Sequence, residues 1–497
     1  ESLISVAATQ EATGNGGNID IETGQLTVRG RSQISATTAG RGAGGNIQIN
    51  ASGSVNIVGQ GFDNLREVRE AILDPGNLEE GTARFNLLTD RRVSGLIAGT
   101  QGKGDSGNIA VTAPTVNLEA GAVITSPTLG RGGGGRITVN AGNLDLNQSS
   151  ISTLAARGSL GAAGNIVVNA RELLLRQDSE LFAPTFGEGA GGAIEIESDR
   201  LLVDGSLISA AATQEAIGDG GYIDIETGQL EVRGQSRIST TTSGRGNGGD
   251  IEVRASESVT LTGTGFENLQ RVRQEILNQE FNLLVNEGAN GLIAGTEGKG
   301  NAGNISLTAP TVTLENGAVI LSPTLRRGPG GIVTVNADSF EAVGSELSTV
   351  ASAGSEGRAG EITINARELE VRDRSSINVT SQGTGRAGSI NIEAERLLLE
   401  NSASLTAETR AGQGDIIPNA RDVILRRDSN ITTNATEEAT GGNIDIDTEN
   451  LISLENSDIT ANAEFSFGGR VIINANGIFG TEFRESEIGR ASCRERV

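Results

Sequence analysis

The stretch Gly16–Glu22, GGNIDIE, decides the fold, because its pattern returns along almost the whole chain. The pattern is one small residue, one glycine and two aliphatic residues that alternate with other residues. Versions of it begin at Gly16, Gly44, Ser106, Gly134, Ala163, Gly191, Gly220, Gly248, Ala302, Gly330, Ala359, Ala387, Gln413, Gly441 and Gly468. Twelve of the fourteen intervals between them are 26 to 29 residues long. A period of this length is typical of solenoids, in which each repeat stacks on its neighbours.

Each repeat contains three short stretches in which apolar and polar residues alternate. In the first repeat these stretches are Asn18–Glu22, Gln25–Val28 and Gln33–Ala36. Such alternation predicts strands with one buried face. The inward residues of this repeat would be Ile19, Ile21, Leu26, Val28, Ile34 and Ala36. Gly24, Gly30 and the loop 40–42 are expected to form the turns, where a positive φ is needed or bulk is unwelcome.

A single coil of this size cannot cover both faces of its apolar layer, so only stacking gives a stable structure. We therefore predict an all-β protein, a right-handed parallel β-helix of about 15 triangular coils of about 28 residues. One repeat domain would span residues 1–486. A longer period supports this, since SLISVAATQEATGNGGNIDIETGQL at Ser2 returns as SLISAAATQEAIGDGGYIDIETGQL at Ser206. This similarity indicates a six-coil duplication, 2–205 and 206–402.

The last eleven residues, 487–497 (EIGRASCRERV), break the periodicity and contain the one cysteine of the chain, Cys493. This segment reads as a non-native tail derived from a sequencing adapter, and we exclude it from the fold prediction. The repeat region therefore has no cysteine for disulfide bonds or cysteine-based zinc sites.

The two long intervals contain one insertion used twice, at 62–94 and 266–290. The insertions carry FDNLREVREAIL and FENLQRVRQEIL, each followed by FNLL. Helical spacing of the apolar residues predicts a short amphipathic helix in each. These residues are Phe62, Leu65, Val68, Ile72, Phe266, Leu269, Val272 and Ile276. Each helix would pack on the flank of the solenoid. It would also be a candidate recognition element, because long insertions on rigid scaffolds often carry binding.

Polar residues recur at fixed positions of the coils. Asn18, Asn46 and Asn108 occupy the same position in three successive coils, and a corner position is shared by Asn140 and Asn169 and by Asn336 and Asn365. Amide side chains stacked along a cross-β direction can hydrogen-bond to one another. We therefore predict structural asparagine ladders.

Acidic residues gather on the outward face of the first strand in three consecutive coils. They are Glu195, Glu197, Asp224, Glu226 and Glu252. Like charges about 4.8 Å apart destabilise each other, so a bound cation would help, and carboxylate oxygens favour Ca²⁺. Three interpretations remain open: a solvated acidic face with Arg254 nearby, a weak Ca²⁺ site, or a pair of catalytic carboxylates. No other cofactor is indicated.

The composition favours a protein that is not an enzyme. The formal charge of −24 argues against nucleic acid and anionic membranes as partners. No apolar run is long enough to span a membrane as a helix. The chain has no His or Trp and a single Tyr, Tyr222, so most acid–base sites lack their commonest member. A phosphate-binding loop and the calcium-binding nonapeptide are also absent.

These repeats resemble filamentous haemagglutinin-like exoproteins of the two-partner secretion type. The likeness is carried by GGNIxI…LxV…SxIS coils, the FDNLREVREAIL insertion and the six-coil duplication. It is closest to the repeat region that follows the haemagglutination-activity domain, and it covers nearly all of 1–486.

The resemblance implies a pectin-lyase-like β-helix that is secreted or displayed on a bacterial cell surface. It also implies export through an outer-membrane transporter, and adhesion to host or neighbouring cells or to glycans. The secretion domain that this transporter recognises is not in the chain, so the export route rests on the resemblance alone. A polysaccharide lyase or hydrolase and a purely structural spacer remain the alternative functions.

Overall fold

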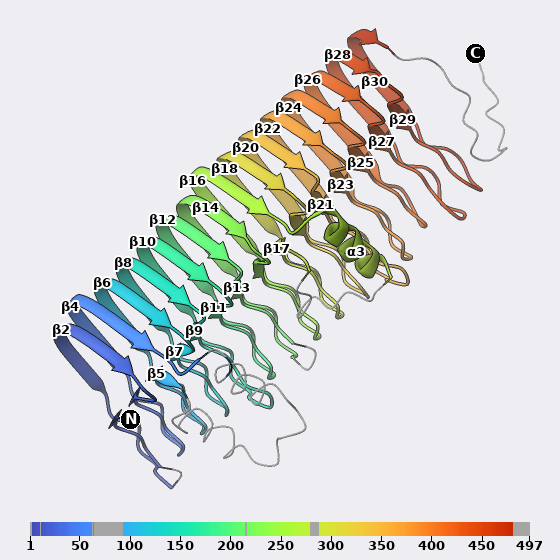
Figure 1. The fold of residues 1–497 in the computed structure, drawn as a ribbon. Helices are drawn as coiled ribbons and strands as arrows, with labels where there is room; N and C mark the ends of the chain where they lie inside the picture. Colours follow the sequence, from blue (N-terminus) through green and yellow to red (C-terminus); the bar gives the residue numbers. More distant parts are fainter. Residues whose placement is uncertain are drawn as a thin grey trace. The chain divides into compact units, whose positions relative to one another are not determined.

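The structure, a computed structural model, describes residues 2–9, 11–61, 63, 93–213, 216–278 and 288–480. It divides into two compact units, Glu1–Arg254 and Ala255–Val497, and each unit is a stack of parallel coils (Figure 1). The boundary lies inside the strand β16 (Ile251–Thr262). The repeat pattern gives no sign of this boundary, which also differs from the end of the first duplicated block at 205.

Each coil contributes one long strand and one short strand, and successive strands of each kind pair in parallel. The long strands of the first unit are β2 (Ile19–Arg29), β4 (Ile47–Val58), β6 (Ile109–Glu119), β8 (Ile137–Asn147), β10 (Ile166–Arg176), β12 (Ile194–Asp204) and β14 (Ile223–Arg233). Its short strands are β1 (Leu3–Ser5), β3 (Gln33–Ser35), β5 (Ser94–Ile97), β7 (Ala122–Thr125), β9 (Ser150–Ser152), β11 (Glu180–Phe182), β13 (Leu207–Ser209) and β15 (Arg237–Ser239).

The second unit repeats this arrangement, and its described residues include one helix, α3 (Phe266–Leu277). Its long strands are β18 (Ile305–Glu315), β20 (Ile332–Val343), β22 (Glu361–Arg372), β24 (Ser389–Glu400), β26 (Asp415–Arg426), β28 (Ile444–Ser453) and β30 (Val471–Phe479). Its short strands are β17 (Gly291–Ile293), β19 (Val319–Leu321), β21 (Glu346–Ser348), β23 (Ser376–Asn378), β25 (Ser404–Thr406), β27 (Asn430–Thr432) and β29 (Asp458–Thr460). The predicted parallel β-helix is therefore confirmed, and its arrangement is consistent with the right-handed sense that strand crossovers favour.

The first two predicted strands of each coil form one long strand that bends at a corner. Between β10 and β12, for example, the pairing passes from Ala170–Ser198 to Glu172–Arg200 and omits the corner residue Arg171. Gly24 lies at the same corner of β2, where its φ is not positive and open space surrounds it. The prediction that Gly24 forms a turn was therefore wrong, because the chain rounds this corner in an extended conformation that any residue adopts. Gly30, in contrast, has a φ of +65°.

The third side of each coil is completed by a single bridge residue. Thr38, Thr100 and Thr128 form successive parallel bridges in the first unit, and Thr296 pairs with Thr324 in the second. All five threonines are fully buried. One bent strand, one short strand and one bridge thus replace the three predicted strands.

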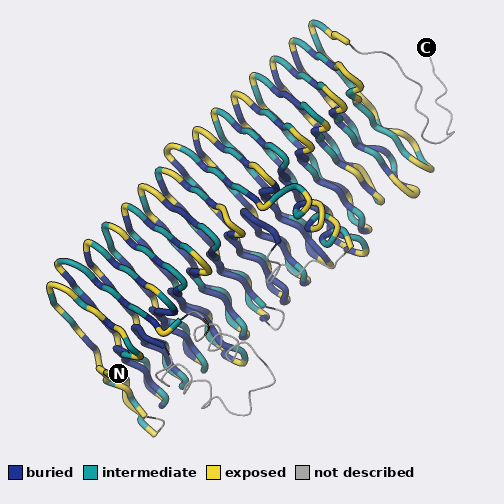
Figure 2. Tube along the Cα trace, in the orientation of Figure 1, coloured by how far each residue is buried: buried dark blue, intermediate teal, exposed yellow. Residues whose placement is uncertain are grey.

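Alternation places the aliphatic residues inside the coils, as predicted (Figure 2). Ile47, Ile49, Val55 and Ile57 of β4 are at most 1% exposed. In the coil before it, Ile19, Val28, Ile34 and Ala36 are buried, while Ile21 and Leu26 are half-buried. Thin aliphatic layers that stack on one another therefore form the core of each unit.

The glycine of the repeated motif has a steric cause. A Cβ atom on Gly45 would lie 1.8 Å from the carbonyl oxygen of Gly17, and one on Gly107 would lie 1.8 Å from that of Gly45. Backbones of successive coils approach so closely here that no side chain fits. The preceding motif position accepts Ser106 or Ala163, so the motif constrains chiefly the second of its two small residues.

Candidate functional site

The acidic residues of the first unit stand in two columns on the outward faces of β12 and β14. Glu195 lies beside Asp224, and Glu197 lies beside Glu226. The alternating residues Ile194 and Ile196 are buried, so the carboxylates point away from the core. The predicted placement of these four residues is confirmed by the strand register.

The carboxylate of Glu195 is held between two donors. Tyr222 donates a hydrogen bond to one of its oxygens at 2.6 Å, and the guanidinium of Arg136 lies 3.5 Å from the other. The hydrogen bond to Glu195, together with burial and nearby carboxylates, raises the pKa of Tyr222 to about 12. The phenol is therefore a hydrogen-bond donor near neutral pH.

A second arginine bonds to carboxylates at the other end of the acidic columns. Arg254 donates a hydrogen bond of 2.7 Å to Asp224 and forms an ion pair with Glu252. Arginines thus offset the like-charge repulsion among Glu195, Asp224 and Glu252, which form one of the two columns. Among the residues that the structure describes, no group of three or more His, Cys, Asp or Glu could hold a metal ion. The geometry therefore lends the Ca²⁺ hypothesis no support.

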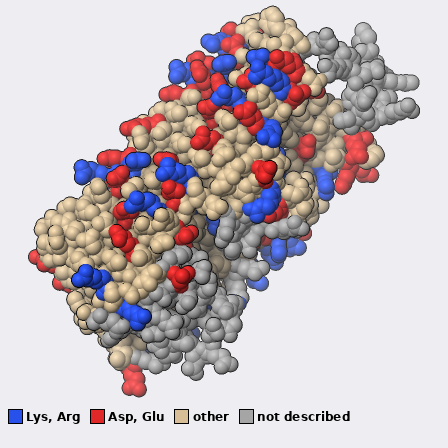
Figure 3. All heavy atoms as spheres, viewed as in Figure 1, with Lys and Arg blue, Asp and Glu red and all other residues tan. Residues whose placement is uncertain are grey.

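Ion pairs between coils continue along the long strands. Arg200 lies 3.6 Å from Glu172 and 3.8 Å from Glu231, on the coils before and after it. Both signs of charge are mixed over the face seen in Figure 3. Since all three side chains are about one-third to one-half exposed, each pair contributes little stability. Their repetition indicates that many surface carboxylates are used to match the charges of neighbouring coils.

In the predicted asparagine ladder, each side chain bonds to the backbone of the next asparagine and not to its side chain. The backbone N–H of Asn46 donates to the side-chain oxygen of Asn18 at 3.0 Å, and the backbone N–H of Asn108 donates to that of Asn46 at 2.8 Å. The prediction of side-chain ladders is correct at the corner position, where the Asn169 side chain donates to Asn140 at 2.8 Å. The side chain of Asn365 donates in the same way to Asn336, also at 2.8 Å. All these bonds connect neighbouring coils.

The second insertion forms the predicted amphipathic helix, α3, which lies over short strands of the second unit (Figure 1). Leu269, Val272 and Ile276 are at most 4% exposed. They pack in one apolar cluster with residues of β17, β19 and the segments around these strands, namely Ala289, Ile293, Val319, Leu321, Leu325 and Val350. Gln270, Arg271 and Gln274 are exposed on the other face.

Polar contacts fix α3 at both ends and in the middle. Arg273 donates a hydrogen bond of 2.8 Å to Glu346, whose side chain is only 4% exposed. The Ser352 hydroxyl donates to the carbonyl of Ile276 at 2.5 Å. The guanidinium of Arg374 lies 3.9 Å from the centre of the Phe266 ring. The helix is therefore docked by apolar and polar contacts together.

The first insertion mostly lies outside the described residues, including Phe62, Leu65, Val68 and Ile72. The FNLL segment of the second insertion and the predicted tail 487–497 also lie outside them. These predictions stay untested.

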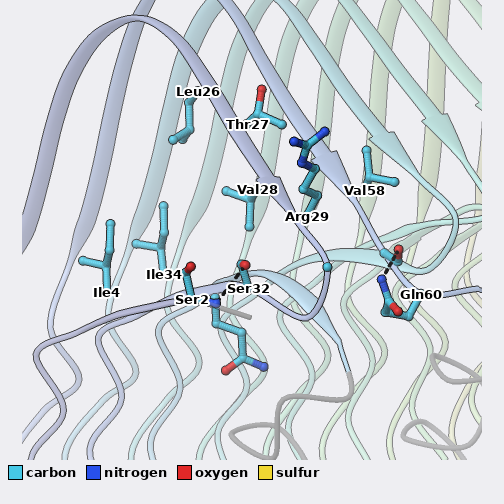
Figure 4. Close-up of a pocket in the computed structure, with 13 residues that line it drawn as sticks. Ser2, Ile4, Leu26, Thr27, Val28, Arg29, Ser32, Ile34, Val58 and Gln60 are labelled. Atoms are coloured by element: carbon cyan, nitrogen blue, oxygen red, sulfur yellow. Dashed lines mark hydrogen bonds between the residues drawn. The ribbon is translucent and has the colours of Figure 1, made fainter.

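A cavity of about 710 Å³ opens at the first coil (Figure 4). Ile4, Leu26, Val28 and Ile34 line it, and Arg29 is the one ionisable residue among the thirteen that line it. This cavity is thus the open face of an apolar core layer. It offers no paired carboxylates for acid–base chemistry.

Sequence reasoning missed Arg136, the Arg273–Glu346 pair and Arg374. Arg136 lies 59 residues before Glu195, which is two coils, so a search for opposite charges at two-coil spacing would have found it. The other two contacts join a helix to strands, and no repeat spacing relates them.

Comparisons of the chain with models of known protein families, with curated proteins and with solved structures found no match. Among the described residues, no helix has the length and apolar character needed to cross a membrane.

Proposed function

We propose that the chain is a non-catalytic β-helix exoprotein of the bacterial cell surface that acts as an adhesin or stalk. Helix α3 is the observation that carries this proposal. Its buried face and its ion pair to Glu346 hold it on a rigid sheet, while Gln270, Arg271 and Gln274 stay exposed. A polar surface held on a rigid scaffold is typical of recognition elements.

The use of the acidic residues supports a non-catalytic role. Glu195 bonds to Tyr222 and Arg136, and Arg254 bonds to Asp224 and Glu252. Three of these contacts link different coils, and the Arg254–Glu252 pair lies within one strand. Holding coils together is a structural use of carboxylates. Export by an outer-membrane transporter of the two-partner type is the part of the proposal that the sequence resemblance alone supports.

Adhesion is tested with beads coated with the chain and applied to bacterial and epithelial cells. We expect attachment by the unchanged chain and a loss in the triple variant Gln270→Ala, Arg271→Ala, Gln274→Ala. This variant leaves the buried face of α3 intact, so its melting temperature should stay unchanged. Deletion of 266–290 is the harsher variant, and melting must be measured alongside its attachment.

The outcomes separate the three functions. Attachment that persists in the folded triple variant would remove α3 as the recognition element. No attachment by the unchanged chain would instead favour a purely structural spacer. Release of reducing or unsaturated ends from anionic polysaccharides would favour a β-helix enzyme and overturn the non-catalytic proposal.

A further inference from the structure

Three consecutive turns of the second unit form an open hollow of about 530 Å³. These turns follow β22, β24 and β26 and lead into the next short strands. The hollow is lined by Asp373, Arg374, Asn401, Ser402, Arg427 and Asp428. Its volume falls within the range of small-molecule sites, about 300–1,000 Å³.

The turns that line the hollow share a left-handed backbone. All six lining residues have a φ between 52° and 66°, the left-handed region that glycine adopts without penalty. Glycine stands in this region at some turns of the chain, such as Gly30, and other residues do so at further turns, such as Gln177 and Asn456. The left-handed backbone therefore belongs to the repeated turn of the coils and does not by itself mark a site. At the three neighbouring turns it holds six polar side chains at the surface, where they line the hollow.

The side chains offer donors and acceptors of balanced charge. The Asn401 side chain donates a hydrogen bond to Asp373 at 2.8 Å, and Arg427 donates to Glu400 at 3.0 Å. Two carboxylates, two guanidinium groups, an amide and a hydroxyl make up the lining. No excess of one sign is present among the six residues to select an ion. The mixture suits a ligand that carries many hydroxyl groups.

The second insertion reaches this hollow through Arg374. The guanidinium of Arg374 lies over the Phe266 ring at 3.9 Å, and Phe266 packs against the apolar cluster under α3. A cation held over an aromatic ring loses freedom before any ligand arrives. The helix that interrupts the coil therefore also orients one wall of the hollow.

We propose that this hollow binds a short neutral oligosaccharide. Arg374, Asn401 and Ser402 would donate hydrogen bonds to sugar oxygens, while Asp373 and Asp428 would accept from sugar hydroxyls. The inference rests on the proposed recognition function and names its ligand class. It also gives the insertion a positioning role in addition to its exposed face.

The test is saturation-transfer NMR of the full chain with millimolar maltotriose, cellotriose and chitotriose, and with a trigalacturonate for comparison. We expect signal from at least one neutral trisaccharide. Arg374→Ala should weaken binding about tenfold, as expected for the loss of a charge-assisted hydrogen bond. Phe266→Leu keeps apolar packing under α3 and should weaken binding by a smaller factor.

Two glycine variants separate binding from stability. Asn401→Gly should weaken binding while its melting temperature stays level or rises, because glycine relieves the left-handed backbone. The matched control is Gln177→Gly at the corresponding turn of the first unit, where φ is 51°. It should behave alike in melting and leave binding unchanged.

Three results would overturn the inference: no signal from any neutral trisaccharide, equal binding by Arg374→Ala, or binding of trigalacturonate alone. Each is distinct from failure of the adhesion proposal. If beads coated with the Arg374→Ala variant still attach to cells, the hollow is excluded as the site of attachment, while the adhesion proposal stands.

Discussion

Charged residues gather in two regions that are built on different backbones. Around Glu195 in the first unit they stand on outward strand positions, and each is set by the register of β12 and β14. Around Asn401 in the second unit they stand at turns with positive φ. In the first region arginines of other coils bond to Glu195 and Asp224, whereas the residues of the second region line a hollow.

The difference shows which part of a solenoid is free to vary. On a strand, the alternation that buries Ile196 also forces Glu195 and Glu197 outward, so charges there follow from the core. At a turn, no core residue dictates the neighbouring side chains, and the backbone accepts polar residues at a modest energetic cost. Recognition is therefore easier to add at turns and insertions than on strand faces.

The largest effect is expected when the inward position between the two acidic columns is changed. Ile196 is 3% exposed, and Ile196→Ala should lower the free energy of unfolding by about 2–5 kcal/mol through lost burial and a cavity. The neighbouring Glu195→Ala removes only half-exposed pairs and should cost less than about 1 kcal/mol. Urea unfolding of both variants measures this contrast. Equal losses would show that the outward charges stabilise the strand as much as the buried isoleucine does.

A buried charge pair should rank next. Arg273→Ala leaves the carboxylate of Glu346, which is 4% exposed, without this arginine, and should cost about 3 kcal/mol. Arg271 on the same helix lies 3.7 Å from Glu275 and is 57% exposed, so Arg271→Ala should cost less than about 0.5 kcal/mol. Thermal melting followed by circular dichroism compares the two. Similar effects would place Glu346 in a wetter environment than its burial indicates.

The strand regions could be predicted from the sequence because one period fixes both burial and register. Ile47 and Ile49 are inside, and Glu195 lies beside Asp224, as alternation requires. The spacing of Phe266, Leu269, Val272 and Ile276 likewise predicted α3. In these cases each side chain's direction follows from its place in a regular element.

The hollow and the corners could not be predicted in this way. Gly24 suggests a turn, yet the chain passes this corner of β2 in an extended conformation. Neither Gly24 nor Arg171, at the same corner of β10, has a positive φ. Asp373 and Arg374 do adopt a left-handed backbone, although their residue types do not predict it. The contact of Arg374 with Phe266 joins residues 108 positions apart by number, and no repeat spacing relates them.

The turns themselves give a smaller effect of opposite sign. Gln177 is exposed and has a φ of 51°. Gln177→Gly should raise the free energy of unfolding by about 0.5–1 kcal/mol, because relief of the left-handed backbone exceeds the entropy lost by glycine. Gly30→Ala, at a φ of +65°, should lower it by a similar amount. Scanning calorimetry resolves both, and a destabilised Gln177→Gly would mean that side-chain contacts hold this turn.

The smallest effect concerns Tyr222, the single tyrosine of a chain without tryptophan. Its pKa of about 12 has the hydrogen bond to Glu195 as its largest cause, so Glu195→Gln should move the pKa towards the ordinary value near 10. Phenolate absorbance reports this titration without interference from other tyrosines. Because the folded-state pKa is the higher one, this group's contribution to stability is complete below about pH 10 and is lost as the pH rises to about 12. That loss should be smaller in Glu195→Gln and absent in Tyr222→Phe. An unchanged pKa in Glu195→Gln would mean that burial, rather than the carboxylate of Glu195, raises the pKa of the phenol. The hydrogen bond between Tyr222 and Glu195 would then contribute less than its length indicates.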